Sequence, residues 1–159
     1  MIMLYRMAAE VDLDALALMR WDFRLEEAPG TPRHDQATFL DACSAFLRQG
    51  LAEQRWVYWI AQQDALIVAH IFIQRIPKVP KPNRLDDALG YVTNVYTRPG
   101  YRGQGIGTQL MAHVLQWAGE QDLESLIVWP SETSVGFYQR AGFQGSSDML
   151  EYTVRPYVL

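Results

Sequence analysis

The sequence predicts an α/β domain with a mixed β-sheet and elements in the order βααβββαβαβ. Short runs rich in β-branched and aromatic residues alternate with longer segments whose apolar residues recur every three or four positions. A glycine-rich turn at 102–107 joins a strand-like run to a helix-like run. Strands that alternate with helices in this way are typical of α/β domains.

The first half of the chain predicts one strand, two helices and a β-hairpin. Apolar residues at helical spacing define both helices, with Asp12 as a candidate N-cap of the first and Gly50 as the stop of the second. The Ala-Pro-Gly-Thr-Pro segment at 28–32 separates them, because proline and glycine break helices. The expected elements are a strand over Ile2–Met7, a helix from Asp12 to about Leu25, a helix over Asp35–Arg48, and hairpin strands over Trp56–Ala61 and Leu66–Ile76.

The second half begins with a loop that contains three prolines and then continues the alternation of strand and helix. Each helix is followed by a glycine, Gly119 or Gly142, which is typical of a helix C-terminus. The final segment alternates apolar and polar residues and therefore predicts a closing strand. The expected elements are a loop over Pro77–Asp87, a strand over Gly90–Thr97, a helix over Thr108–Ala118, a strand over Ser125–Trp129, a helix over Ser131–Ala141 and a strand over Met149–Val154.

Length and composition favour a single domain over residues 1–159, with 49% apolar and 20% charged residues. The net charge of −4 argues against a general nucleic-acid binder, because such proteins carry a basic surface. No apolar run approaches the length of a membrane span and no signal segment is evident, so we expect a cytoplasmic protein. Cys43 is the sole cysteine, which excludes an internal disulfide and a cysteine-based metal site.

The turn from Arg102 to Gly107 is the strongest functional signal in the sequence. A glycine-rich turn that opens a helix leaves backbone N–H groups unpaired at the positive end of the helix dipole, where phosphate binds. A Walker loop would require Gly-Lys-Ser/Thr, and this turn has no lysine. A dinucleotide fingerprint would require Gly-x-Gly-x-x-Gly, and the spacing here is Gly-x-Gly-x-Gly.

Two blocks resemble the GCN5-related N-acetyltransferase (GNAT) family. Asn94–Gly107 is similar to the acetyl-CoA loop of that family, and Phe137–Phe143 is similar to its Tyr-x-x-x-Gly-Phe segment. The resemblance implies a mixed central sheet of about six to seven strands flanked by about four helices. It also implies acetyl-CoA as co-substrate and no metal.

The resemblance also implies which residues bind the cofactor. The pyrophosphate would lie on the glycine turn, and main-chain groups of the preceding strand would contact pantetheine, with one N–H polarising the thioester carbonyl. Arg102 has two interpretations, a phosphate ligand or a surface arginine. Ser131 replaces an asparagine that often contacts pantetheine, and helix capping is the preferred interpretation of it. The expected cofactor-binding residues are Val95, Tyr96, Thr97, Arg102, Gly103, Gln104, Gly105, Ile106, Gly107, Thr108, Ser131 and Tyr138.

Tyr138 is the expected catalytic residue, because the family uses a tyrosine at the matching position. Its phenol would donate a proton to the departing CoA thiolate. The base that accepts the proton of the amine stays open among five carboxylates, each of which is also interpretable as a surface charge. These are Glu26, Glu27, Asp86, Asp87 and Glu132.

Other chemistry-bearing side chains are interpreted as structural. The histidines His34, His70 and His113 have no partner at metal-ligand spacing. The chain is rich in aromatic residues, and some of them are candidates for an acceptor pocket although core packing is the default. These are Trp21, Phe23, Trp56, Trp59, Tyr91 and Trp129.

The expected function is transfer of an acetyl group from acetyl-CoA to an amine, either a small molecule or a peptide or protein amino group, by direct attack in a ternary complex. The alternative is a non-catalytic acyl-CoA-binding sensor or interaction module on the same fold. A third interpretation is a nucleotide-binding protein that uses the glycine loop. Exposed strand edges near the C-terminus would allow a homodimer.

Overall fold

A five-stranded mixed sheet in the order β1-β2-β3-β4-β5 organises the chain. The structure is a computed structural model that describes residues 2–145 and 148–157. β1 to β4 pair antiparallel with their neighbours, and β5 joins the sheet parallel to β4. The strands are β1 (Met3–Met7), β2 (Trp56–Gln63), β3 (Leu66–Pro77), β4 (Ala88–Thr97) and β5 (Leu126–Ile127).

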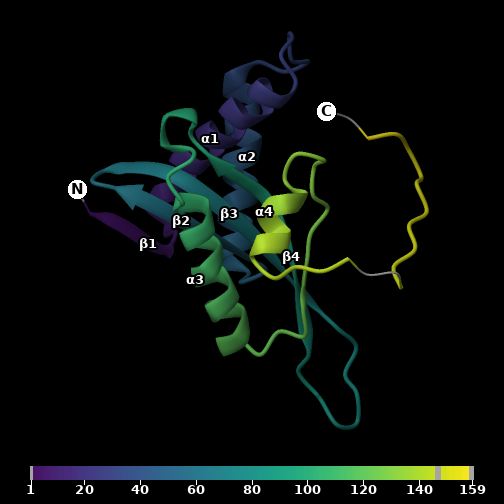
Figure 1. Cartoon of the computed structure of the whole chain (residues 1–159). Helices are drawn as coiled ribbons and strands as arrows, with labels where there is room; N and C mark the ends of the chain where they lie inside the picture. The colour runs from purple at the N-terminus through teal and green to yellow at the C-terminus, as the bar shows by residue number, and fades with distance from the viewer. Residues whose placement is uncertain (1, 146–147, 158–159) are drawn as a thin grey trace.

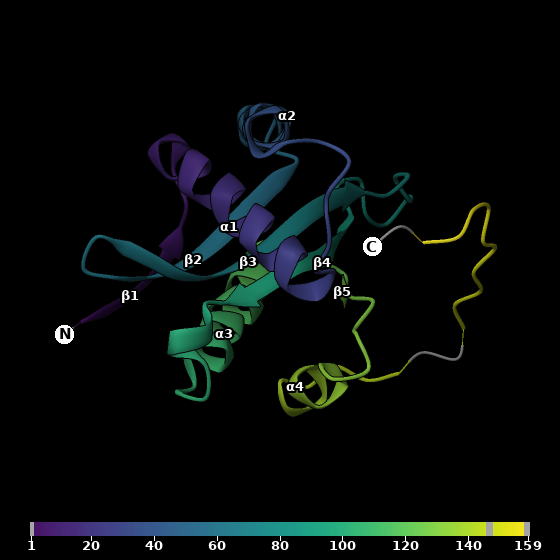
Figure 2. The same ribbon diagram turned by 90° about the horizontal axis from the view of Figure 1, so that it is seen from above.

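Four α-helices cover the two faces of this sheet, with α1 and α2 on one face and α3 and α4 on the other (Figures 1 and 2). Two short 3₁₀ turns, Glu10–Asp12 and Pro99–Tyr101, precede α1 and the glycine loop. The helices are α1 (Leu13–Glu27), α2 (Gln36–Ala52), α3 (Ile106–Glu120) and α4 (Val135–Arg140).

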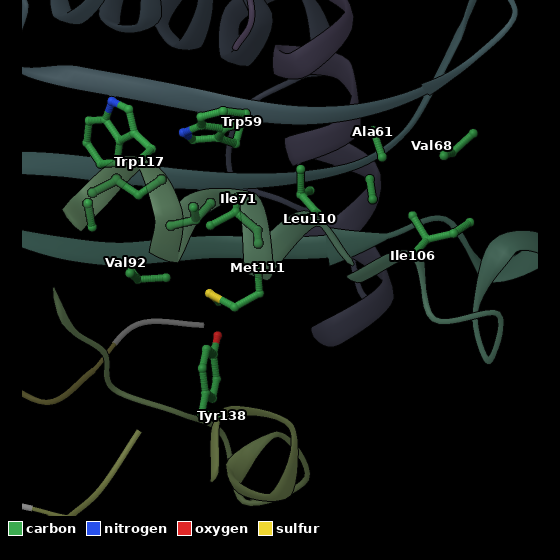
Figure 3. Packing of buried hydrophobic residues seen from close by; sticks show 14 residues of the cluster. Trp59, Ala61, Val68, Ile71, Val92, Ile106, Leu110, Met111, Trp117 and Tyr138 are labelled. Carbon is green, nitrogen blue, oxygen red and sulfur yellow. The ribbon is translucent and has the colours of Figure 1, made fainter. Parts of the chain in front are cut away.

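The core lies in two layers because successive strand residues point to opposite faces of the sheet. On β2, Tyr58 packs with α1 and α2, and its neighbour Trp59 packs with α3. Figure 3 shows the second layer, in which Tyr138 of α4 projects toward Met111 of α3. Each layer buries large apolar side chains completely, so the sheet is fixed from both sides.

β4 differs along its length, and this difference positions the site. A β-bulge interrupts its pairing with β3 where Phe72 opposes Thr93 and His70 opposes Tyr96, so β4 carries one extra residue. Asn94 takes a left-handed backbone with φ of 50°, which asparagine tolerates better than most residues. On its other edge, β4 pairs with β5 only through two residue pairs, Gly90–Leu126 and Tyr91–Ile127. The two strands are unpaired beyond that point.

The predicted class and the four helices are confirmed, but the expected six to seven strands are too many. The segment Met149–Val154, expected as a strand, forms none, and the chain from Asp148 to Tyr157 extends away from the sheet (Figures 1 and 2). Leu150 and Tyr152 there are at least 90% exposed. Alternating polarity gives a segment the propensity for a strand, but a strand also requires a neighbour to pair with.

Two of the expected glycine helix stops are wrong, and one of them is Gly119, because α3 continues through it to Glu120. Gly50 does not stop α2, which continues to Ala52. A Cβ at Gly50 would lie 2.7 Å from atoms of Trp56 and Tyr58, so close packing requires glycine at this position. Asp12 occupies the N-cap position of α1 as the sequence predicts, but its side chain forms no capping hydrogen bond. Its carboxylate instead accepts the N–H of Ala9 and binds Arg6 at 2.8 Å, which fixes the turn before α1.

Candidate active site

A cleft of about 660 Å³ opens where β4 and β5 diverge. Its walls come from the last two turns of α1, the second half of β4, the segment after β5, and α4. This side of the sheet lacks a paired strand, so β4 presents main-chain groups to a ligand much as an edge strand would. The cleft therefore follows from the short pairing of β5.

The glycine loop lies at the end of β4 and opens α3. Gly103 and Gly105 have φ values of 72° and 77°, and no atom lies within 4 Å of a Cβ built on either residue. The first helical bond runs from the N–H of Gln109 to the carbonyl of Gly105 at 3.0 Å. Within the described residues, no backbone carbonyl accepts a hydrogen bond of good geometry from the N–H groups of 103–108, so they are available to an anion.

Arg102 joins the glycine loop to α1. Its guanidinium pairs with Glu26 at 2.6 Å, lies over the ring of Tyr96 at 5.4 Å, and donates through Nε to the carbonyl of Thr97 at 2.8 Å. The hydrogen bond from Arg102 holds the pKa of Glu26 below its usual value. Arg102 thus lines the cleft, although its side chain is 46% exposed.

The second half of β4 runs along the floor of the cleft. Val95, Tyr96 and Thr97 all line it. The N–H of Arg98 donates to the carbonyl of Val68 on β3 at 2.9 Å, so alternation along the strand directs the N–H of Thr97 to the opposite edge, which faces the cleft. The hydroxyl of Tyr96 donates to Glu26 at 3.1 Å.

Tyr138 lines the cleft from α4 and is buried. Its ring packs edge-on against Phe137 and Phe143, which holds the side chain in one place. Burial, and secondarily the phenol of Tyr91, raise the pKa of Tyr138 to about 12. The phenol therefore keeps its proton at neutral pH, as a proton donor requires.

Gly142 ends α4 as the sequence predicts. Its φ is 104°, its N–H donates to Gln139, and the N–H of Phe143 donates to the carbonyl of Tyr138 at 3.0 Å. This pattern is a Schellman motif, which requires a left-handed residue that glycine adopts at little cost. The motif packs Phe143 against the tyrosine ring and so fixes the orientation of Tyr138.

Ser131 lines the cleft but does not cap α4, so the preferred sequence interpretation is wrong. The N-cap position belongs to Ser134, and α4 begins at Val135. The hydroxyl of Ser131 donates to Ser134 Oγ at 3.0 Å within the turn that precedes the helix. The capping interpretation failed because Ser131 and Ser134 are equally good cap residues by type.

Two of the five candidate carboxylates, Glu26 and Glu27, line the cleft. Asp87 is only 3% exposed and is held at the base of the β3–β4 loop by Lys78, Lys81 and Arg84. Asp86 pairs with Arg75 at 3.3 Å. Glu132 lies next to Ser131 in sequence but is not among the residues that line the cleft.

The aromatic candidates divide between cleft and core. Phe23, Tyr91 and Trp129 line the cleft, and the rings of Tyr91 and Trp129 meet edge-to-face at 5.1 Å. Trp21 packs on Phe39 outside the cleft. The remaining two, Trp56 and Trp59, pack with the two core clusters.

The histidines have structural surroundings. His113 stacks on Tyr5 at 5.0 Å, and His34 is exposed. His70 is fully buried beneath the bulge, where its Nδ1 lies 2.7 Å from the carbonyl of Asn94. Because a carbonyl only accepts, Nδ1 carries the proton of a neutral ring. Burial is the main reason that the pKa of His70 falls to about 3.

Sequence reasoning missed Arg20, which lines the cleft and donates to Asn94 Oδ1 at 2.9 Å. A signal for it was present, because Arg20, Phe23, Arg24 and Glu27 follow the i, i+3, i+4, i+7 spacing of one helix face. All four line the cleft. A mixed face of this kind differs from the fully apolar face that a helix presents to a core.

The described residues, 2–145 and 148–157, contain no group of three or more His, Cys, Asp or Glu side chains arranged to hold a metal ion. They also contain no helix that is both long enough and apolar enough to span a membrane.

Comparison with known proteins identifies solved structures with the same fold. A predicted acetyltransferase from Clostridium acetobutylicum, solved with acetyl-CoA, is 27% identical with a TM-score of 0.79 over 96% of this chain and 97% of its own. A GCN5-related N-acetyltransferase from Ralstonia eutropha JMP134 is 23% identical with a TM-score of 0.75, over 97% of this chain and 100% of its own, and shows the shared fold.

A sequence relative is the glucosamine 6-phosphate N-acetyltransferase of Trypanosoma brucei brucei, which is 32% identical over 65 residues. The match spans 41% of this chain and 44% of the relative. The family model described as the acetyltransferase (GNAT) family matches residues 15–143, which include the glycine loop, the cleft and Tyr138. The chain therefore belongs to the GNAT acetyltransferase family.

Proposed function

We propose that this protein is an N-acetyltransferase that moves an acetyl group from acetyl-CoA to an amine by direct attack in a ternary complex. The observation that carries the proposal is the glycine loop next to an unpaired stretch of β4. Together they offer an anion site and an open strand edge along one cleft. A molecule that joins a pyrophosphate to an extended amide arm suits this combination.

The residues of the loop fit the phosphate end of CoA. Gly103 and Gly105 hold left-handed conformations and leave their surroundings free of atoms, so a phosphate has room to approach the backbone. The N–H groups of Gly103–Thr108 would bind the pyrophosphate. The main chain of Val95–Thr97 would bind the pantetheine arm, and Ser131 would contact it from the opposite wall.

The remaining roles follow from the chemistry of the thioester, whose acyl carbon an amine attacks and whose thiolate departs. An N–H on the cleft edge of β4, such as that of Thr97, would hydrogen-bond the acyl oxygen and stabilise the charge that develops there. The phenol of Tyr138 would give its proton to the departing sulfur. A pKa of about 12 suits this role because the phenol stays protonated throughout the neutral range.

The proton of the attacking amine would pass to Glu26, directly or through water. Glu26 lines the cleft and is hydrogen-bonded by both Tyr96 and Arg102, which fixes its position on the wall formed by α1. Its pKa lies below the usual value, so it is ionised across the neutral range, as a proton acceptor must be, although a lowered pKa also makes it a weaker base.

The first experiment is calorimetric titration with acetyl-CoA, CoA, NAD and ATP. We expect acetyl-CoA and CoA to bind and the two nucleotides not to compete with them. Gly105→Val should weaken CoA binding at least tenfold, because a β-branched residue resists a φ of 77° and narrows the approach to the backbone. Gly100→Val is the matched control, since Gly100 also has free surroundings but lacks a positive φ.

Turnover is then measured as thiol release from acetyl-CoA across a panel of amines. Glucosamine and glucosamine 6-phosphate belong in the panel because a sequence relative carries that substrate in its name. The proposal is supported if the wild-type protein acetylates any of these amines and if Gly105→Val loses both CoA binding and this activity. CoA binding without turnover across the panel would favour a non-catalytic acyl-CoA-binding module, and absence of CoA binding would overturn both.

A further inference from the structure

Arg20 is a partly buried arginine that reaches the cleft from α1. Its Nη1 donates to Asn94 Oδ1 at 2.9 Å, and its guanidinium lies 5.9 Å from the centre of the Phe23 ring. Asn94 is the left-handed residue of the β4 bulge. Arg20 is therefore held at one point by a neutral amide, and the rest of its planar set of N–H donors remains available.

The charges that line the cleft are unbalanced at Arg20. Arg24 pairs with Glu27, and Arg102 pairs with Glu26. Among the described residues Arg20 forms no ion pair, so the five charged side chains of the cleft leave one positive charge uncompensated. This surplus stands out in a chain whose net charge is −4.

An arginine in this setting favours an anionic partner. Burial, and then the neighbouring charge of Arg24, lower the pKa of Arg20, which means that its charged form is under-solvated. A carboxylate or phosphate that binds the free donors would compensate the charge through two parallel hydrogen bonds. The same pair of guanidinium N–H donors binds neutral groups less strongly.

The position of Arg20 matches the part of the cleft that an acceptor would occupy. Its partner Asn94 lies three residues before Thr97, about 10 Å back along β4, and the glycine loop begins five residues beyond Thr97 at Arg102. The pair formed by Arg102 and Glu26 lies next to Tyr96. The aromatic pair Tyr91 and Trp129 lines the cleft farther still from the loop.

We propose that Arg20 binds an anionic group on the acceptor, so that the preferred substrates are amines that also carry a carboxylate or a phosphate. The inference rests on the proposed N-acetyltransferase function and adds its substrate class. Tyr91 and Trp129 would accommodate the body of such an acceptor, while the amine faces the thioester.

The test uses matched pairs of amines that differ only by the anion. Tyramine and tyrosine form the carboxylate arm, and ethanolamine and O-phosphoethanolamine form the phosphate arm. We expect kcat/KM to be at least tenfold higher for the anionic member of at least one pair. Arg20→Met should lower kcat/KM for the anionic member at least tenfold more than for the neutral member, and Arg20→Lys should restore part of that preference, because lysine keeps the charge but not the paired donors of the guanidinium.

Arg48→Met is the matched control, since it removes an exposed arginine of α2 that lies outside the cleft. A structural role for Arg20 at the bulge would lower turnover of both members of a pair equally, and that result would overturn the proposal. If the wild-type protein itself has a higher kcat/KM for the neutral member of each pair, the proposal is overturned and no variant is needed.

Calorimetry separates this proposal from the proposed function. CoA-loaded protein is titrated with tyrosine and with O-phosphoethanolamine, so binding is detected even without turnover. Binding that Arg20→Met weakens at least tenfold supports the anion site. Normal CoA binding with no binding of either anionic amine overturns the anion site alone, whereas absent CoA binding overturns the proposed function.

Discussion

The two edges of β4 serve different purposes. On the β3 side, β4 is paired from Ala88 to Thr97 with a single bulge. On the β5 side, only Gly90 and Tyr91 are paired with β5, and residues 91–97 line the cleft. The paired edge belongs to the part of the sheet that packs against both helical layers. The comparison shows how one strand can be rigid on one side and remain open to a ligand on the other.

The bulge connects the two edges. It turns the backbone at Asn94. The main-chain carbonyl of Asn94 contacts buried His70 on the core side, and its side-chain oxygen Oδ1 accepts a hydrogen bond from Arg20 on the cleft side. The core therefore positions the floor of the cleft through one asparagine. If this account is correct, substitutions on the open edge should change catalysis with little effect on folding, and substitutions at the paired edge should do the reverse.

The largest effect is expected from Tyr138→Phe on the open side. Loss of the proton donor should lower kcat about 100-fold or more, whereas CoA affinity should stay within a factor of about three. Steady-state kinetics and calorimetry measure the two quantities, with Tyr152→Phe in the exposed tail as control. Because the pKa of Tyr138 is about 12, kcat of the wild-type protein should not fall between pH 7 and about pH 10. An unchanged kcat in the variant would contradict the acid role.

A smaller loss is expected from Glu26→Gln. Removing the base should reduce kcat/KM at pH 7 by about 10- to 100-fold, and the deficit should shrink as pH approaches the pKa of the free amine, which then arrives deprotonated. Glu132→Gln is the control, since Glu132 does not line the cleft. A deficit that stays constant with pH would indicate that Glu26 acts by holding Arg102 and not as a base.

Substitution of Gly90 should separate stability from catalysis. A Cβ at Gly90 would lie 2.5 Å from Leu126 Cδ2 and 3.0 Å from Ile73 Cγ2, so Gly90→Val should destabilise the fold by about 1–3 kcal/mol in denaturant unfolding. Gly119→Ala in α3 meets no atom within 4 Å and should add about 0.5–1 kcal/mol. Gly90→Val with unchanged stability would show that the pairing of β4 with β5 is loose.

The most gradual effect is expected from His70, which should make the free energy of unfolding depend on pH. The pKa of His70 in the folded state, about 3, lies below the ordinary value of 6.5, so the unfolded chain binds a proton that the native protein does not. This contribution to stability is present above pH 6.5 and is lost as pH falls toward 3, by up to about 1.4 kcal/mol per pH unit. His70→Phe should flatten this slope in unfolding curves between pH 7 and 4.5, and His34→Gln is the matched control. An unchanged slope in His70→Phe would exclude His70 as its source.

The sequence predicted the strands and helices that have strong local signals. Periodicity identified α1, α2 and α3, and Gly142 marked the end of α4 because its left-handed conformation is a local requirement. The failures depend on contacts that are distant in sequence. Gly50 resembles a helix stop, but its role is set by Trp56 and Tyr58 on β2. The alternation of apolar and polar residues at Met149–Val154 indicates a propensity for a strand, but it does not indicate whether a neighbouring strand is available to pair with it.

The candidate site shows the same division. The glycine loop and Tyr138 could be selected from the sequence, because a phosphate-binding turn and a tyrosine-glycine block are local motifs. For Arg20 the sequence offers only the mixed face of α1, since the importance of this arginine depends on the bulge at Asn94 and on its lack of an ion pair among the described residues. Likewise, the choice of Glu26 among five carboxylates required the contacts with Tyr96 and Arg102.

Amide hydrogen exchange with and without CoA tests the central claim most directly, because the claim concerns backbone N–H groups. We predict that CoA slows exchange at Gly103–Thr108 and at one or more amides of Val95–Thr97, whereas β2 and β3 are unaffected because their amides are already paired. Slower exchange elsewhere, with no change in the glycine loop or in β4, would contradict the assignment of the open edge as the cofactor site.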